Sequence, residues 1–235
     1  MLRSLALHLL PGVFMLVVFM LAAPPALSAG LPPLIPVLGS AAIGLAFQLW
    51  HLLVEGKKRN GTWSLAGIVL NRLPMPAWQY AALTFGFVML AFLINGLTAP
   101  IGAALLETMP WLPDWFEIRN VSTLAQYSRE MLLLTFLLVV LPINGLAAPI
   151  VEELYFRGYL LPRLERFGRW TPVLAAALFT LYHFWQPYYW PTVFLSMLPV
   201  VYAVWWKRSV KLGIFIHMAL NILGSLLTLL QVLGS

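Results

Sequence analysis

The sequence predicts an all-α protein, a polytopic transmembrane helical bundle of about seven spans with possible extra interfacial helices. Of its 235 residues, 61% are hydrophobic and only 9% are charged, and the mean hydropathy is +0.87. Soluble domains carry about 25% charged residues, so this composition indicates a membrane protein. Each span uses about 20 residues and the connections are short, so we expect a single transmembrane domain, 1–235.

Seven apolar segments support this fold, and they lie at 5–23, 34–54, 77–97, 131–148, 172–187, 190–206 and 212–233. The first could instead be a cleaved signal peptide, because the small-residue stretch 26–29 follows it. Its apolar run is long for that role, so we expect the segment to be retained. Between the second and third spans, the segment from Trp63 to Trp78, with Pro74 and Pro76, is expected to lie at the membrane surface.

The charged residues between these segments predict the orientation in the membrane. One set of connections is basic and carries Arg3, Lys57, Lys58, Arg59, Arg72, Arg157, Arg163, Arg166, Arg169, Lys207, Arg208 and Lys211. The opposite set carries Glu107, Asp114, Glu117 and Glu130 against Arg119 and Arg129. By the positive-inside rule, the N-terminus is cytoplasmic and the C-terminus lies outside. We therefore expect an integral protein of a prokaryotic cell (plasma) membrane, in contact with lipid. Topology explains the net charge of +6, so nucleic-acid binding is not indicated.

The first group of residues with chemical potential is 149–158, Pro-Ile-Val-Glu-Glu-Leu-Tyr-Phe-Arg-Gly. Charge at bilayer depth costs about 2.5 to 3.5 kcal/mol on insertion scales, so it marks an internal site, a structural lock or an ion path. On a helix, Glu153 and Arg157 are four residues apart and can pair, whereas Glu152 points about 100° away. Glu153 is thus assigned a structural partner, and Glu152 is left to face a cavity.

The local sequence also predicts a helix boundary at this point. Asn144 and Gly145 weaken the preceding helix, and Pro149 suits a first helical turn. We therefore expect a break or kink near Pro149 that places Glu152 close to a new helix start, where the helix dipole favours a carboxylate.

Two further motifs with polar side chains lie in apolar segments. Phe179 and His183 are four residues apart, and so are His217 and Asn221 in the last span, where both side chains share one helix face. Individually, each is more often a packing or hydrogen-bonding residue than a catalyst. Together with Glu152, however, His183, His217 and Asn221 make four polar groups in hydrocarbon, and we expect them to face one internal polar cavity.

These three motifs resemble the CAAX prenyl protease type II and bacteriocin-processing (CPBP, or ABI) family of intramembrane proteases. The family pattern is Glu-Glu-x-x-x-Arg, Phe-x-x-x-His and His-x-x-x-Asn, and all three motifs occur here in order within 130–225. The resemblance implies a CAAX-type intramembrane endopeptidase in which Glu152 is the general base and His183 helps it to activate water. It also implies that His217 and Asn221 hold the oxyanion, while Glu153 and Arg157 give structural support. The implied substrate is a peptide or a lipidated protein.

A metal and a non-catalytic function are the open alternatives. Glu152, His183 and His217 could form the two-histidine, one-carboxylate ligand set of a catalytic zinc site. The absence of Cys excludes thiolate ligands, and no His-Glu-x-x-His motif is present, so we favour a metal-free glutamate mechanism without a cofactor. The same cluster could instead stabilise a partner-binding or immunity protein, or act as the relay of a small proton-coupled transporter.

The expected depths of the polar residues disagree. From the assumed cytoplasmic ends of their spans, His183 is about 16 Å deep and His217 about 8 Å, with Glu152 shallower still. We expect a tilt, the break near Pro149 or shifted boundaries to reconcile them, in a cavity that opens toward the cytoplasmic leaflet.

Overall fold

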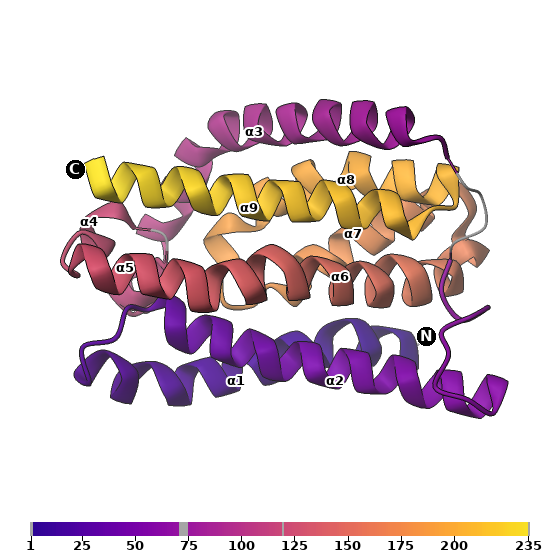
Figure 1. Cartoon of the computed structure of the whole chain (residues 1–235), viewed down its shortest axis with the longest axis horizontal. Helices are drawn as coiled ribbons and strands as arrows, with labels where there is room; N and C mark the ends of the chain where they lie inside the picture. Colours follow the sequence, from indigo (N-terminus) through magenta and orange to yellow (C-terminus); the bar gives the residue numbers. More distant parts are fainter. Residues whose placement is uncertain (1, 71–74, 119, 235) are drawn as a thin grey trace.

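The computed structural model describes residues 2–70, 75–118 and 120–234, and this part of the chain is all-helical (Figure 1). Arg72, Pro74 and Arg119 lie outside the described residues. The longer helices are α1 (Leu2–Ser28), α2 (Leu34–Asn60), α3 (Ala77–Glu107), α7 (Thr171–Tyr182), α8 (Trp190–Lys207) and α9 (Val210–Gly234). Shorter elements are η1 (Asp114–Phe116), α4 (Val121–Leu124) and η5 (Pro187–Tyr189). The region before α7 is built from α5 (Arg129–Thr135), η2 (Phe136–Ala147), α6 (Ala148–Glu152), η3 (Glu153–Leu160) and η4 (Leu161–Trp170).

Five helical stretches in the described residues are long and apolar enough to cross a membrane, and they are Arg3–Ser28, Leu34–Asn60, Ala77–Glu107, Arg129–Tyr182 and Val210–Gly234. The protein is therefore an integral membrane protein. Each of the seven predicted apolar segments corresponds to a helix. The segment expected at 172–187 ends early, however, because α7 stops at Tyr182. With 12 residues, α7 is only about 18 Å long, which is too short to cross about 30 Å of hydrocarbon.

The prediction that the helix breaks near Pro149 and starts anew before Glu152 is wrong. The backbone is right-handed helical at Ala147, Ala148, Glu152 and Glu153, so α5, η2, α6 and η3 form one continuous helix, which we call the long helix. η2 and η3 are π-helical, and the N–H of Ala148 donates to the carbonyl five residues earlier. Glu152 therefore lies inside a helix, not at its start. The turn comes later, at Gly168, whose φ of 55° and ψ of −128° suit glycine.

The two ends of the bundle differ in charge. Figure 1 shows the long helices side by side, with the N-terminus at one end and the C-terminus at the other. We name them the basic end, where α2 finishes and α9 begins, and the acidic end, where α2 begins and α9 finishes. The basic end carries Arg3, Lys57, Lys58, Arg59, Arg163, Arg166, Arg169, Lys207, Arg208 and Lys211, and the acidic end carries Glu107, Asp114, Glu117, Arg129 and Glu130.

Candidate active site

Glu152 is buried between three elements. One carboxylate oxygen, Oε1, accepts a hydrogen bond from the hydroxyl of Tyr182 at 3.2 Å. That hydroxyl in turn accepts one from the amide nitrogen of Gln48, at 2.9 Å, and Gln48 is wholly buried in α2. The other oxygen, Oε2, lies 4.0 Å from Nε2 of His217. This gap is too long for a hydrogen bond, and one bridging water can span it.

Glu153 is the fixed member of the glutamate pair. It is wholly buried, and its Oε1 lies 3.2 Å from Nη1 of Arg157 and 3.1 Å from Nδ1 of His217. The predicted ion pair with Arg157 is thus present. Because a carboxylate only accepts, Nδ1 of His217 carries a hydrogen, and the ring turns Nε2 toward Glu152. Gly213 makes room for this carboxylate, since a Cβ there would meet Oε2 of Glu153 at 2.3 Å.

Arg157 is held in the interior by stacking. The sequence places it with the cytoplasmic connections, which is wrong, because the side chain is only 1% exposed. Its guanidinium lies 3.8 Å from the centroid of the Phe179 ring. Within the described part of the chain, neither Nη1 nor Nη2 has a hydrogen-bond partner. Charge attraction to Glu153 and contact with the aromatic face therefore hold the cation. This gives Phe179 of the Phe-x-x-x-His motif a physical role.

His183 occupies the point where α7 ends. Its φ of −80° and ψ of 54° leave the helical region, and its Nδ1 lies 2.8 Å from the carbonyl of Phe179. Because that carbonyl only accepts, Nδ1 carries the hydrogen, and Nε2 is the acceptor nitrogen of the neutral ring. The backbone carbonyl of His183 accepts from the indole of Trp190 at 3.0 Å, which ties the α7 terminus to α8.

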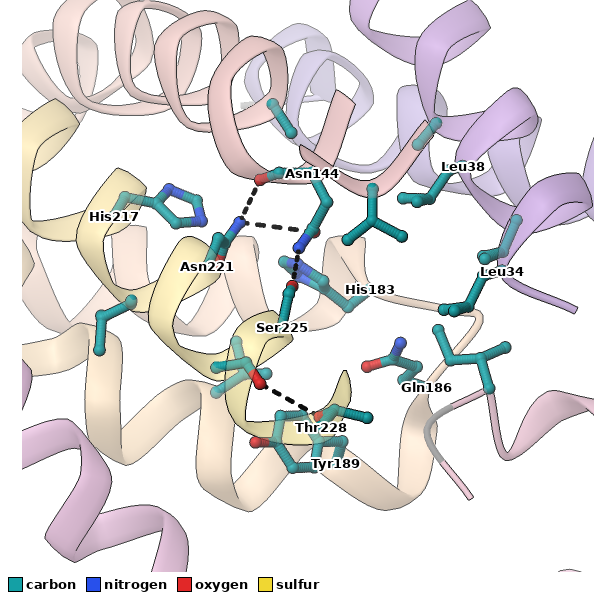
Figure 2. Close-up of a pocket in the computed structure, with 18 of the residues that line it drawn as sticks. Leu34, Leu38, Asn144, His183, Gln186, Tyr189, His217, Asn221, Ser225 and Thr228 are labelled. Atoms are coloured by element: carbon teal, nitrogen blue, oxygen red, sulfur yellow. Dashed lines mark hydrogen bonds between the residues drawn. The ribbon is translucent and has the colours of Figure 1, made fainter. Parts of the chain in front are cut away.

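Asn221 is oriented by a residue of the long helix. Its amide nitrogen donates to the backbone carbonyl of Asn144 at 2.8 Å, and the Asn144 side chain donates to Ser225 at 3.1 Å (Figure 2). Pro149 explains why that carbonyl accepts a side chain. In the π-helical pattern the partner of Asn144 is five residues on, and Pro149 there has no N–H.

The four predicted catalytic side chains line one cavity of about 240 Å³. Figure 2 shows His183, His217 and Asn221 around it, and Glu152 also belongs to its lining. A single water needs only about 10 to 15 Å³, so the cavity has room for a nucleophilic water and part of a substrate. Its arrangement can present a carboxylate, two imidazoles and an amide to one bound group.

The alternative zinc site does not fit these side chains. Within the described residues, no group of three or more His, Cys, Asp or Glu side chains is placed to hold a metal ion. The set Glu152, His183 and His217 is therefore not arranged as metal ligands in this conformation.

The contacts at the site resolve the disagreement in depth. Oε2 of Glu152 lies 4.0 Å from Nε2 of His217, and His183 lines the same cavity, so the three side chains lie at a similar level inside the bundle. The expected direction of the cavity needs correcting as well. Its lining includes Leu34, Leu124 and Val232, and it therefore extends toward the acidic end, away from the predicted cytoplasmic side.

Several neighbours of the site do not follow from motif spacing. Tyr182 is next to His183 but outside the motif, and Gln48 lies in a distant span. In the sequence, Asn144 indicates only a weakened helix. The one available signal is that buried polar groups in hydrocarbon require partners, which indicates that Gln48 and Asn144 face the interior.

The fold and the cavity define a class of protein, a polytopic membrane bundle with an internal polar site. Residues 134–223 match the family model described as "Type II CAAX prenyl endopeptidase Rce1-like". This match includes all three motifs and confirms the family resemblance. It supports membership of a family of membrane endopeptidases, which are hydrolases. Comparison with curated proteins and with solved structures finds no match for the chain.

Proposed function

We propose that this protein is an intramembrane endopeptidase in which Glu152 activates a water molecule to hydrolyse a peptide bond. The observation that carries the proposal is that Glu152, His183, His217 and Asn221, from three separate segments, all line one internal cavity. Helix packing alone does not require four polar side chains to share a cavity, whereas hydrolysis of an amide does need a base and oxyanion donors in one place.

In the proposed reaction, Glu152 accepts a proton from a water molecule that His183 helps to orient. The water oxygen attacks the peptide carbonyl carbon. The resulting oxyanion is stabilised by the amide N–H of Asn221 and by His217, which must carry a hydrogen on Nε2 as well as on Nδ1 to donate there. The tetrahedral intermediate collapses as the carbon–nitrogen bond breaks, and the proton passes from Glu152 to the leaving amine. Tyr182, Glu153 and Asn144 hold Glu152, His217 and Asn221 respectively in fixed directions.

The test is cleavage of a peptide panel, with and without prenyl groups, by the purified full-length protein in lipid nanodiscs. Glu152→Gln keeps the shape of the side chain and removes the base, so we expect cleavage to fall by about 10² to 10⁴-fold. Glu165→Gln is the matched control, because Glu165 is an exposed glutamate paired with Arg208 on the surface. Cleavage that survives Glu152→Gln in a folded protein refutes the role of Glu152.

The same panel separates the alternatives. A partner-binding or immunity protein cleaves nothing and loses thermal stability when the cluster is altered. A proton-coupled transporter gives no cleaved products and shows uptake driven by a proton gradient in vesicles. Products that disappear with Glu152→Gln are expected only for the protease.

We infer that the basic end faces the cytoplasm of a prokaryotic cell, which places the N-terminus inside and the C-terminus outside. The support is the separation of charge between the ends: Lys57, Lys58 and Arg59 lie in the last turn of α2, whereas Asp114 and Glu117 follow α3 at the other end.

A further inference from the structure

The cavity extends from the polar cluster in one direction only. On α2 it is lined by residues of the first two turns, Leu34 to Ala41, and on the long helix by residues from Leu132 to Glu152. On α9 its lining begins at His217 and continues to Val232, close to the C-terminal end. In Figure 1 these portions of the three helices all lie toward the end of the bundle that carries α4, which is the acidic end.

The opposite side of the cluster is filled by side chains. On η3 and η4 these are Tyr155, Tyr159, Leu160 and Leu161, and on α9 they are Leu212 and Ile216, all at most 1% exposed. The segment before α3 closes this side further, because the N–H of Leu70 donates to the carbonyl of Gly158 at 2.9 Å. This close-packed layer separates the cluster from the basic end.

The side chains that line the outer part of the cavity indicate which kind of ligand it can bind. Apolar side chains such as Leu34, Leu38 and Leu229 line it together with the neutral polar groups of Gln186 and Thr228. Among the described lining residues, Glu152 is the one carboxylate, and none is Lys or Arg. An extended polypeptide segment with uncharged, mainly apolar side chains suits such a lining, because the polar groups can bond its backbone.

We propose that the cavity is loaded from the side of the membrane opposite the cytoplasm, and that its substrate is an uncharged, apolar polypeptide segment presented there. The C-terminal peptide of a cytoplasmic protein would have to pass the layer around Tyr155 and Ile216. That the bound segment is a substrate rests on the proposed function, but the direction from which the cavity is reached can be measured without any cleavage.

The chain contains no Cys, so single cysteines report accessibility directly. Thr228→Cys places a thiol in the cavity, Gln126→Cys marks the acidic end, and Thr62→Cys marks the basic end. Each variant is treated with a small charged methanethiosulfonate that does not cross membranes, in intact cells and in inverted vesicles. Labelling after denaturation and a monodisperse elution profile establish that each variant is intact, and Ser225→Cys provides a second cavity position.

We expect Thr228→Cys and Gln126→Cys to react in intact cells at least about tenfold faster than in inverted vesicles, and Thr62→Cys to show the reverse. The inference is overturned if Thr228→Cys reacts faster in inverted vesicles, as Thr62→Cys should. It is also overturned if Thr228→Cys reacts in neither preparation. Reaction of Gln126→Cys only in inverted vesicles overturns the orientation and the inference with it. If Glu152→Gln abolishes cleavage but the cavity cysteines react from the basic end, the proposed function stands and only this inference is refuted.

Discussion

Replacing Arg157 by Met should destabilise the bundle strongly. The guanidinium and the Glu153 carboxylate are 1% and 0% exposed and lie 3.2 Å apart. At an effective dielectric constant of about 20, unit charges at that distance attract by about 5 kcal/mol. Removing one partner of a buried pair typically costs about 3 to 5 kcal/mol because the other charge remains buried. Since Glu153 keeps its contact with His217, we expect a loss near 3 kcal/mol in the free energy of unfolding.

The assay is unfolding by denaturant in mild detergent, followed by the fluorescence of the 10 tryptophans. Arg166→Met is the matched control, because Arg166 is an exposed arginine that also lies against an aromatic ring, 4.8 Å from the Phe167 centroid. It should change stability by at most about 0.5 kcal/mol. The double variant Glu153→Gln, Arg157→Met removes both charges and should recover more than half of the loss. A single variant within about 1 kcal/mol of wild type, or a double variant no better than the single, would refute this reasoning.

Three other outcomes follow from the same contacts. Gly12→Ala should lower the free energy of unfolding by about 1 to 3 kcal/mol, because the new Cβ would lie 2.1 Å from the Tyr182 carbonyl oxygen. Gly39→Ala is the control, because a Cβ there meets nothing within 4 Å, and it should be neutral or stabilising in the same unfolding assay. Tyr182→Phe should cost about 1 to 3 kcal/mol by leaving the buried Gln48 amide without its acceptor, and adding Gln48→Leu should restore stability; no recovery would contradict this account of the hydrogen bond. Prolonged treatment with a chelator should leave peptide cleavage unchanged, and a loss that zinc restores would disprove the metal-free mechanism.

Motif spacing predicted that the two glutamates have different surroundings. The interval from Glu153 to Arg157 predicts the ion pair that the structure contains, and the 100° offset of Glu152 predicts that it faces the cavity. Such arguments succeed because they concern one helical turn. The catalytic roles of the four cavity residues stay predictions.

Contacts between distant segments could not be predicted in the same way. The link from Gln48 through Tyr182 to Glu152 depends on how α2 and α7 are rotated against the long helix. The continuity past Pro149 also escaped prediction, because a proline was read as a helix start. Here the lost N–H is compensated when the Asn144 carbonyl accepts from Asn221, a residue of the last span.

The π-helical stretches η2 and η3 make the spacing along the long helix as important as its residue types. Each wide turn holds more residues than an α-helical turn of the same rise, so the count between Ser128 and Arg157 fixes the direction in which Glu152 points. Gain of one further residue in η2 would swing everything after it by about 100°, turning the carboxylate out of the cavity, whereas loss of one residue from a wide turn would return that turn to α-helical geometry. Substitutions in this stretch should thus be tolerated far better than single-residue insertions.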